Sequence, residues 1–472
     1  MKPLIAVLVC KALYFIGKLI GRGSSLPGQA ALRVCPDALK RLELPETIIA
    51  VTGSNGKTTT VEMIAHVLET AGMKIGCNRE GSNQTEGIAT LLLRTATLGG
   101  RVKRDALVLE CDERYARKIF ENVRPSVLLV TNLCRDQLTR NGHPEFIQDC
   151  IRSAIEACQK KDGTETTTTL VLNADDPYVA SLAASNASEI PTSWFGIKRG
   201  ATTPDAQPRR KQEPSEKKDN PAHTAASPIY DDGAFCPECK GRMSYEYRIT
   251  AHLGGYRCAE CGHTRPKPAF EVTGFDYDTG LVTLNKIVTS LMHTDLAGVY
   301  NLAAAIAAAA AVGINPSISA SALDRYELKG GRTVRFTLGG RKGILLVSKH
   351  ENSLAYNQTL EWAIGQQKPC TVIILVDAIS RKYYTSETSW LWDINFDILA
   401  DECVQNIILA GRYHNELAAR FAMTPVKPSK ISLVPDWSGL RTHTIRNTTG
   451  EIYAVTCFSD KRKISKTFKS PA

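Results

Sequence analysis

The residues with the clearest chemical potential lie in a glycine loop near the start of the chain. Residues 52–60 read Thr-Gly-Ser-Asn-Gly-Lys-Thr-Thr-Thr, between an apolar run at 48–51 and a helical pattern at 61–72. A strand, a glycine loop and a helix in this order suit a phosphate, because loop N–H groups and the helix N-terminus point at the anion. The sequence therefore predicts nucleotide binding here, rather than an ordinary glycine turn.

Each residue type in this loop has a role in such a site. Gly53 and Gly56 let the backbone approach the phosphates without a Cβ atom. Lys57 can bridge the outer phosphates, and the Thr58 hydroxyl can hold Mg²⁺. We expect Lys57 to face solvent until ATP arrives. The nucleotide-binding residues predicted in the loop are Gly53, Asn55, Gly56, Lys57, Thr58 and Thr59.

Three further residues complete the predicted nucleotide site. Glu110 follows the apolar run at 106–109, and folds with a phosphate loop place a second Mg²⁺ anchor at the tip of a neighbouring strand. The alternative is a solvated loop acid. Asn301 lies in the first turn of an alanine-rich helix at 296–313, and Arg332 follows two glycines at the start of a later strand and helix series.

Four cysteines form a second chemical signature. Cys236 and Cys239 make one CxxC pair, Cys258 and Cys261 make another, and eighteen residues separate the pairs. This spacing is typical of tetrahedral Cys₄ zinc. Four thiolates leave no open position, so the predicted Zn²⁺ is structural and stabilises a ribbon too small to fold without it. His263 is a possible substitute ligand but is more simply a bystander.

The elements that must position these residues alternate along the chain. Short apolar runs at 73–78, 106–111, 126–131 and 169–173 are separated by helical patterns, which predicts an α/β fold with a mainly parallel, doubly wound sheet. The domains that we predict are an N-terminal helical segment at 1–45, a central ATP-binding domain at 46–315, a mobile polar insertion at 199–228, a zinc ribbon at 229–270 and a smaller α/β domain at 316–472.

Composition sets limits on the function. The chain has 472 residues, a net charge of +10 and 14 cysteines. The charge would suit nucleic acid, an anionic membrane face or a phosphorylated substrate and cannot choose among them. The cysteines outside the CxxC pairs are scattered through apolar runs, as buried thiols usually are, so we predict a reducing cytoplasm.

Residues 4–20 form an apolar helix interrupted by Lys11 and Lys18. Three interpretations stay open for it. The helix packs on its own domain, lies at the inner membrane face as an interfacial helix, or acts as a signal or membrane span. The lysines and the absence of a persuasive cleavage site disfavour the third interpretation.

Together these motifs resemble the MurT family, Mur-ligase-like subunits that work with the glutaminase GatD to amidate the D-glutamate of lipid II. Val51 stands where a general phosphate loop has glycine, but the loop fits the TGxNGKT pattern of Mur ligases. The resemblance rests on 26–28, 52–60, 78–83, 131–132, 135–137, 172–177, the inserted ribbon and 389–393. The ribbon and the Arg135-Asp136-Gln137 triplet distinguish this family from amino-acid-adding Mur ligases. Those ligases lack the ribbon and typically carry Asp-His where this chain has Asp136-Gln137.

The resemblance implies a Mur-ligase-type central domain, a Rossmann-like C-terminal domain and an ATP-dependent carbon–nitrogen ligase. In that chemistry ATP and Mg²⁺ activate the D-glutamate α-carboxylate of lipid II as an acyl phosphate, which ammonia attacks. A GatD-type glutaminase, bound as a heterodimer, supplies the ammonia. The family donates an acid to the partner's Cys-His pair, and the matching residue here is Glu387, with Asp393 as the spare candidate. Residues 349–357 depart from the family pattern.

Two other functions compete with this interpretation. One is a ligase that adds an amino acid to a UDP-linked peptide without a partner; a neighbouring gene for a small glutaminase would argue against it. The other is a nucleic-acid-binding protein built on the ribbon. The ribbon has few aromatic residues beyond Tyr245, Tyr247 and Tyr256, and the charge is spread along the chain, so we predict no nucleic-acid partner. Contact with the inner membrane face stays open.

Overall fold

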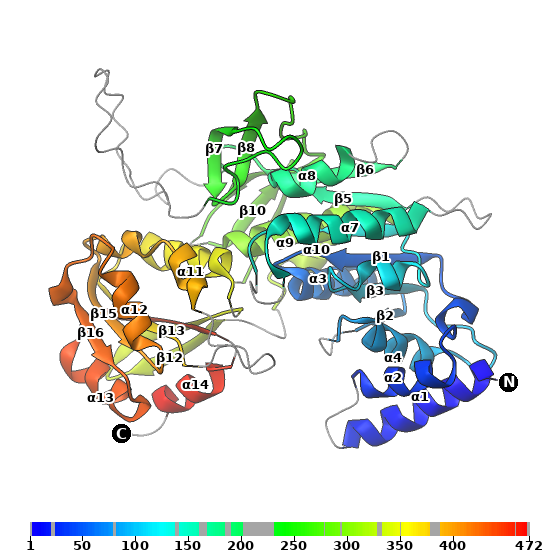
Figure 1. Cartoon of the computed structure of the whole chain (residues 1–472), viewed down its shortest axis with the longest axis horizontal. Helices are drawn as coiled ribbons and strands as arrows, with labels where there is room; N and C mark the ends of the chain where they lie inside the picture. The colour runs from blue at the N-terminus through cyan, green and yellow to red at the C-terminus, as the bar shows by residue number, and fades with distance from the viewer. Residues whose placement is uncertain are drawn as a thin grey trace. The chain divides into compact units, whose positions relative to one another are not determined.

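The computed structural model describes residues 2–19, 24–78, 82–136, 141–159, 168–184, 190–201, 231–277, 279–292, 295–327, 333–349, 351–377, 388–457 and 459–469. The chain divides into two compact units, drawn in Figure 1 mainly in blue to green and in yellow to red. The first unit contains residues 1–134, 143–202 and 233–328, and the second contains 135–142, 203–232 and 329–472. Arg332, Glu387 and almost all of the predicted insertion at 199–228 lie outside the described residues. The domain boundaries given above stay predictions.

The first unit is built on a nine-stranded sheet with the order β11-β10-β9-β6-β5-β4-β1-β3-β2. Neighbours from β2 to β9 pair in parallel, and β10 and β11 add an antiparallel edge. The strands are β1 (Thr47–Thr52), β2 (Ile75–Cys77), β3 (Ala106–Glu110), β4 (Val127–Val130), β5 (Thr169–Asn173), β6 (Thr192–Ile197), β9 (Phe270–Phe275), β10 (Leu281–Leu284) and β11 (Ile287–Ser290). Strands β1, β3 and β4 are continuous apolar runs because helices cover both faces of a parallel sheet.

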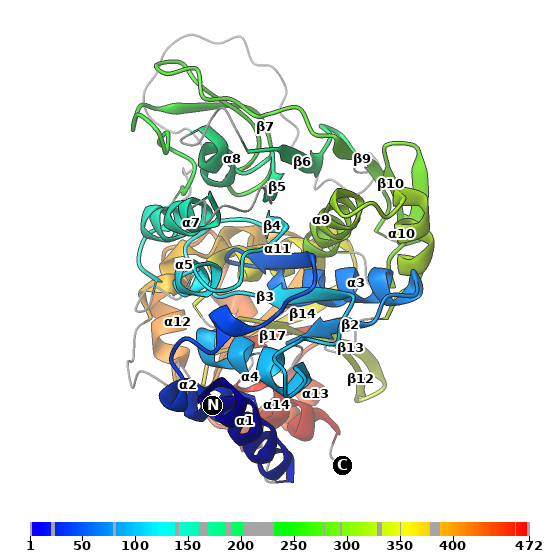
Figure 2. The same cartoon turned by 90° about the vertical axis from the view of Figure 1, so that its right-hand side faces the viewer.

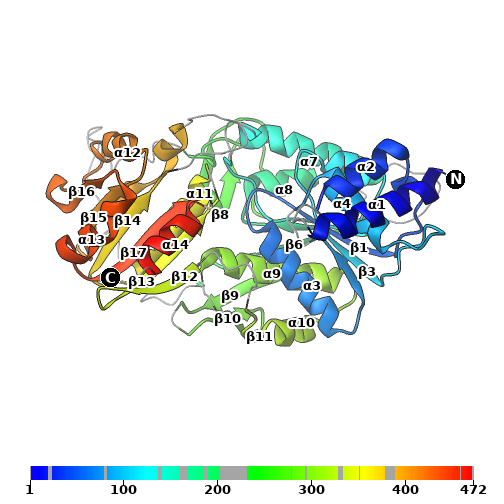
Figure 3. The ribbon, with the colours of Figure 1, turned by 90° about the horizontal axis from the view of Figure 1, so that it is seen from below.

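Helices cover the two faces of this sheet, as Figure 3 shows. One face carries α3 (Lys57–Thr70), α9 (Leu296–Ala311) and α10 (Pro316–Leu323), which share a core with Ile49 and Val51 of β1. The other face carries α4 (Thr85–Thr95), α5 (Ala116–Phe120), α7 (Pro144–Gln159) and α8 (Pro177–Ala184). Six of the nine alanines of α9 are buried, because small side chains let this helix approach the sheet and α3 closely. The doubly wound α/β prediction is confirmed.

The chain begins with α1 (Lys2–Leu19), α2 (Leu26–Val34) and the short 3₁₀ turn η1 (Leu39–Arg41). Figures 1 and 2 show α1 and α2 beyond α4, on the side away from the sheet. Ala6, Val7 and Cys10 of α1 join the same core as α4. The helix therefore packs on its own unit, as the first of the three interpretations predicted. Within the described residues, no helix is long and apolar enough to cross a membrane.

The ribbon is an antiparallel hairpin of β7 (Met243–Thr250) and β8 (Leu253–Cys258), inserted in the chain between β6 and β9. The buried Asp175 carboxylate, just after β5, anchors it to the sheet. Arg265 donates from Nε to Asp175 at 2.6 Å, and the Tyr300 hydroxyl of α9 donates to the same carboxylate at 2.8 Å. Asp175 thus connects the sheet, the ribbon and α9.

The second unit has a six-stranded sheet with the order β12-β13-β17-β14-β15-β16, parallel except for the β12–β13 pair. One face carries α11 (Ser353–Gly365), α12 (His414–Phe421), η3 (Ser389–Asp393) and η4 (Phe396–Ala400), and the other carries α13 (Trp437–Asn447) and α14 (Lys461–Lys469). The strands are β12 (Thr333–Leu338), β13 (Arg341–Ser348), β14 (Cys370–Leu375), β15 (Val404–Ala410), β16 (Ile431–Val434) and β17 (Glu451–Cys457). A smaller Rossmann-like α/β unit was predicted here and is confirmed.

Candidate functional site

The glycine loop joins the carboxyl end of β1 to the N-terminus of α3. Gly53 and Gly56 have φ angles of +121° and +83°, in the region that favours glycine. A Cβ at Gly53 would collide with the Thr131 hydroxyl, and one at Gly56 would collide with the Asn301 side chain. The first turn of α3 contains no acidic residue, so its N–H groups can receive an anion. The loop therefore has the backbone geometry of a phosphate site.

Residues after β4 brace this loop from the side. The amide of Ser54 donates to the Asn132 carbonyl at 2.8 Å, and the amide of Asn55 donates to Asn132 Oδ1 at 3.1 Å. The Thr131 hydroxyl donates to the Asn55 carbonyl at 2.6 Å. These hydrogen bonds fix the loop before any ligand binds, which lowers the ordering cost of binding.

The structure corrects the prediction that Lys57 faces solvent. Its side chain is 9% exposed, and Nζ lies 2.5 Å from the Glu113 carboxylate, whose side chain is 4% exposed. Nζ also donates to the Gly53 carbonyl. Burying an ammonium group without an anionic partner is costly, and the segment that follows β3 supplies that partner as Glu113. Glu113 was missed because its partner is 56 positions away in sequence.

Thr58 and Glu110 meet as predicted for an Mg²⁺ site. The exposed Thr58 hydroxyl donates to Glu110 Oε2 at 2.8 Å, and Asn83 Nδ2 donates to Oε1 at 3.0 Å. Asn78 pairs with the backbone of Glu110 through its Oδ1 and Nδ2 atoms, at 2.8 and 2.9 Å. A hydroxyl beside a carboxylate oxygen is a donor set that Mg²⁺ accepts. These residues therefore fit the ion, with Asn83 orienting the carboxylate and Asn78 fixing the backbone of Glu110.

The two remaining described residues of the predicted nucleotide set lie beside the loop. Asn301 is buried, and its Oδ1 accepts a hydrogen bond from the Thr60 hydroxyl at 3.3 Å. It lies against Gly56 in the second turn of α9, not in the first turn as predicted, because the helix begins at Leu296. Thr59 is half-buried in the first turn of α3.

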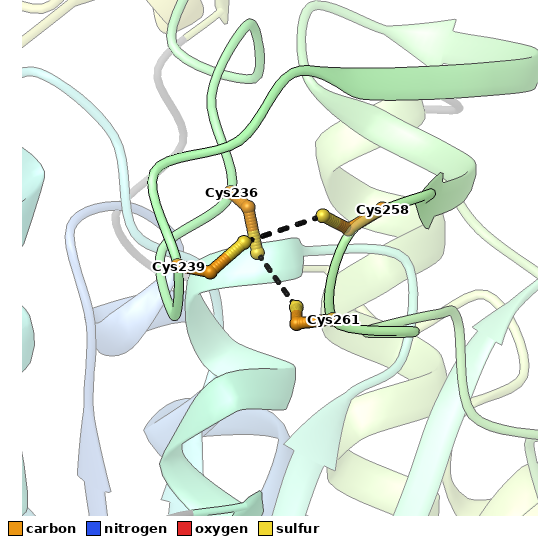
Figure 4. A group of neighbouring side chains, drawn as sticks. All are labelled: Cys236, Cys239, Cys258 and Cys261. Atoms are coloured by element: carbon orange, nitrogen blue, oxygen red, sulfur yellow. Dashed lines mark hydrogen bonds between the residues drawn. The ribbon is translucent and has the colours of Figure 1, made fainter.

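The four ribbon cysteines converge, as Figure 4 shows. All four sulfurs lie within 4.8 Å of one another, with 3.6 Å between Cys236 and Cys261 and 3.5 Å between Cys239 and Cys258. Four thiolates around a zinc ion, with Zn–S bonds of about 2.3 Å, place sulfurs about 3.8 Å apart. The cluster therefore fits a tetrahedral metal, and Zn²⁺ is the ion that this donor set favours.

The surroundings act differently on the ribbon thiols, and burial raises the pKa of Cys236 to about 12. The backbone N–H of Cys261 lowers the pKa of Cys258 to about 7. His263 Nε2 lies 3.0 Å from the Pro177 carbonyl and is not part of the cluster. His263 is therefore a structural neighbour of the cluster.

In the second unit, several predicted residues are engaged in ion pairs. Arg135 Nη1 lies 3.1 Å from the carboxylate of Asp393, whose side chain is 8% exposed. The buried Asp136 carboxylate pairs with Lys349 Nζ and accepts from Asn352 Nδ2 at 3.0 Å. The segment that departs from the family pattern thus holds the aspartate of the Arg135-Asp136-Gln137 triplet, whereas Gln137 lies outside the described residues.

Comparison with known proteins agrees with this architecture. Residues 51–224 match the Mur ligase middle domain, and residues 350–459 match the MurT ligase C-terminal domain. The chain is 27% identical to the Streptococcus pneumoniae lipid II isoglutaminyl synthase (glutamine-hydrolyzing) subunit MurT, over 92% of this chain and 89% of that protein. It is also 27% identical to the Staphylococcus aureus subunit of the same name, over 90% of this chain and 87% of that protein.

Solved structures share the fold. The chain superposes on a pseudomurein peptide ligase type C from Methanothermus fervidus with a TM-score of 0.64 and 20% identity, over 92% of this chain and 80% of that one. Such a likeness concerns the fold alone. With the two domain matches, it establishes a Mur ligase fold that carries a MurT-type C-terminal domain.

Proposed function

Starting from a chain that is a Mur-type ATP-dependent ligase with a MurT-type C-terminal domain, we propose that it amidates the D-glutamate α-carboxylate of the lipid II stem peptide. The product would be D-isoglutamine. The observation that carries this proposal is the similarity to MurT subunits along 92% of the chain, because it covers the nucleotide site, the ribbon and the C-terminal domain together.

The nucleotide site supplies the groups that such a reaction needs. A carboxylate is a poor electrophile, so an oxygen of the D-glutamate carboxylate attacks the γ-phosphorus of ATP and ADP leaves. The resulting acyl phosphate is then attacked at carbon by ammonia, and phosphate leaves as the amide forms. The N–H groups of the loop and Lys57 stabilise the charge on the transferring group.

Thr58 and Glu110 would hold Mg²⁺, which supplies charge neutralisation at the phosphates when it is bound. Lys57 must exchange the Glu113 carboxylate for phosphate oxygens, since both compete for one ammonium group. Glu113 is therefore a positioning residue that keeps Lys57 at the loop in the absence of nucleotide.

The ammonia is proposed to come from a GatD-type glutaminase bound as a heterodimeric partner. Glu387 would complete the partner's Cys-His pair by orienting the histidine and stabilising its protonated form. The geometry of Asp393 supports Glu387 as the acid, because Asp393 is already paired with Arg135 and its side chain is 8% exposed.

The site of action is proposed to be the cytoplasm, where ATP and glutamine are available. The absence of any disulfide among the fourteen cysteines supports a reducing compartment. Most of those outside the ribbon are buried thiols, and burial raises the pKa of Cys10 and Cys158 to about 12. Such thiols are inert and serve packing.

The experiment that tests the proposal is co-expression with a GatD-type glutaminase, copurification, and a glutamine-dependent amidation assay on lipid II. We expect product only with ATP, glutamine and both subunits, and we expect added ammonia to replace glutamine. Glu113→Gln should slow the reaction whereas Arg117→Ala, an exposed neighbour, should not. Ligation of an amino acid to a UDP-linked peptide by this chain alone would reject the proposal in favour of an amino-acid-adding ligase.

A further inference from the structure

Helix α1 exposes an apolar stripe along one side. Its members have exposed fractions between 41% and 70%, although all of them are large and hydrophobic. At 100° per residue their positions fall within about 120° of the helix circumference, so they form one continuous strip. The apolar stripe consists of Leu4 (41%), Ile5 (45%), Leu8 (48%), Phe15 (70%) and Ile16 (53%).

The opposite side of α1 is the side that stabilises the unit. Ala6, Val7 and Cys10 are buried at 0%, 2% and 0% exposure and contact the core shared with α4. Figures 1 and 2 show α1 as the outermost helix of this layer. The packing of α1 is thus complete without the stripe, and exposed large side chains at helical spacing need another explanation.

A basic groove of about 540 Å³ runs beside the stripe. No carboxylate lines it among the described residues. Two of its cations are held in place, since Lys11 Nζ donates to the Arg94 carbonyl at 3.0 Å and the Arg94 guanidinium lies 4.5 Å from the centroid of the Tyr14 ring. The charged residues that line the groove are Lys11, Lys18, Arg94, Lys103 and Arg104.

We propose that the stripe and the groove dock this unit on the anionic phospholipid surface of a bilayer. The apolar side chains of α1 would enter the boundary between headgroups and acyl chains, and the groove cations would contact lipid phosphates. Charge complementarity favours a lipid surface as the binding partner. Five cations beside an apolar helical stripe match an anionic membrane interface better than a protein surface of mixed charge. The helix lies on the membrane and does not span it, in agreement with its length and hydropathy.

Membrane docking through α1 does not depend on the proposed amidation. A lipid-carried substrate would be met at the bilayer, so docking would raise the local concentration of enzyme there. Vesicle binding needs neither ATP nor turnover, so either proposal can fail without the other.

The test is cosedimentation of the full chain with vesicles of phosphatidylcholine alone or mixed with phosphatidylglycerol. We expect binding to the mixed vesicles that weakens with salt, and little binding to phosphatidylcholine. The double variant Lys103→Ala/Arg104→Ala should bind roughly 30-fold more weakly, at about fivefold for each cation near the surface. Phe15→Ser and Ile16→Ser should each weaken binding roughly tenfold, from the lost apolar burial.

Two matched controls use exposed residues elsewhere in the same unit. Phe146→Ser removes a 50% exposed aromatic from α7, and Lys198→Ala removes an exposed cation after β6, so neither should change vesicle binding. All variants should unfold at the wild-type temperature, because the substituted side chains contribute little to the core.

Four results would overturn the inference. These are no binding of the wild-type chain to anionic vesicles, equal binding to neutral vesicles, wild-type binding by the stripe and groove variants, and release from vesicles by inorganic pyrophosphate at an ionic strength that leaves binding intact when sodium chloride supplies it. The last would indicate a pocket for a free phosphate compound. Loss of glutaminase copurification in the Phe15→Ser variant, with vesicle binding intact, would assign the stripe to a protein partner and reject the lipid surface.

Discussion

Replacing Lys57 by alanine should destabilise the unit as well as abolish ATP-dependent chemistry. The Lys57–Glu113 pair is almost completely buried, with side chains 9% and 4% exposed and 2.5 Å between charged atoms. Removing one member leaves the other charge buried without compensation, which costs about 3–5 kcal/mol. For a unit of this size 1 kcal/mol corresponds to roughly 2–4 °C in unfolding temperature, so Lys57→Ala should unfold at least about 6 °C lower.

Glu113→Gln removes the anionic member of the Lys57–Glu113 ion pair. The ammonium group of Lys57 then keeps only neutral acceptors such as the Gly53 carbonyl, and the ligand-free protein should again be destabilised by about 3 kcal/mol. Bound nucleotide would return an anionic partner to Lys57. The rise in unfolding temperature on adding ATP and Mg²⁺ should therefore be larger for Glu113→Gln than for the wild type.

The assay is thermal unfolding of each variant, with and without ATP and Mg²⁺, followed by chemical denaturation to obtain free energies of unfolding. Arg117→Ala is the matched control, because Arg117 pairs with Glu121 at 3.3 Å on the exposed surface of the same region, with side chains 58% and 42% exposed. It should change stability by no more than about 0.5 kcal/mol.

The reasoning would be refuted if Lys57→Ala and Glu113→Gln unfolded like the Arg117→Ala control. A double-mutant cycle gives a stricter criterion. Lys57→Met combined with Glu113→Leu should recover much of the stability lost in either single variant, because two apolar groups replace a buried ion pair. Strictly additive losses would mean that the two charges do not interact in the folded protein.

Three other outcomes follow from the structure. Cys236→Ser should remove about one zinc per chain by metal analysis and increase proteolysis within the ribbon, and full zinc content would exclude the Cys₄ site. Glu387→Ala should lower glutamine hydrolysis in the complex by orders of magnitude while ammonia-dependent amidation survives, Glu387→Asp should retain activity, and the opposite pattern with Asp393→Ala would move the acid to Asp393. Arg265→Ala should cost about 3–5 kcal/mol, because it leaves the fully buried Asp175 unpaired. Burial raises the pKa of Asp175, so the loss should be smallest at low pH, where the carboxyl is protonated, and should grow as pH rises; a loss independent of pH in denaturant titrations would contradict this account.

Most of the architecture could be predicted from local patterns in the sequence. The run at 169–173 corresponds residue for residue to β5, because a buried parallel strand is predominantly apolar. The loop at 52–60 and the two CxxC pairs were equally readable, since phosphate binding and tetrahedral ligation constrain residue type and spacing over short distances. Strand ends were less certain, as β2 is three residues long within a predicted run at 73–78.

Tertiary structure alone decided which groups meet across the chain. Lys57 pairs with Glu113, 56 positions away. Asn78 and Asn83 form hydrogen bonds with Glu110, 32 and 27 positions away. Likewise, the periodicity at 4–20 predicted a helix, but only packing on α2 and α4 determined which of its sides is buried and which is the exposed apolar stripe. Spacing along a sequence specifies contacts within a helix or a loop, whereas contacts between elements depend on how the elements pack, which no single segment encodes.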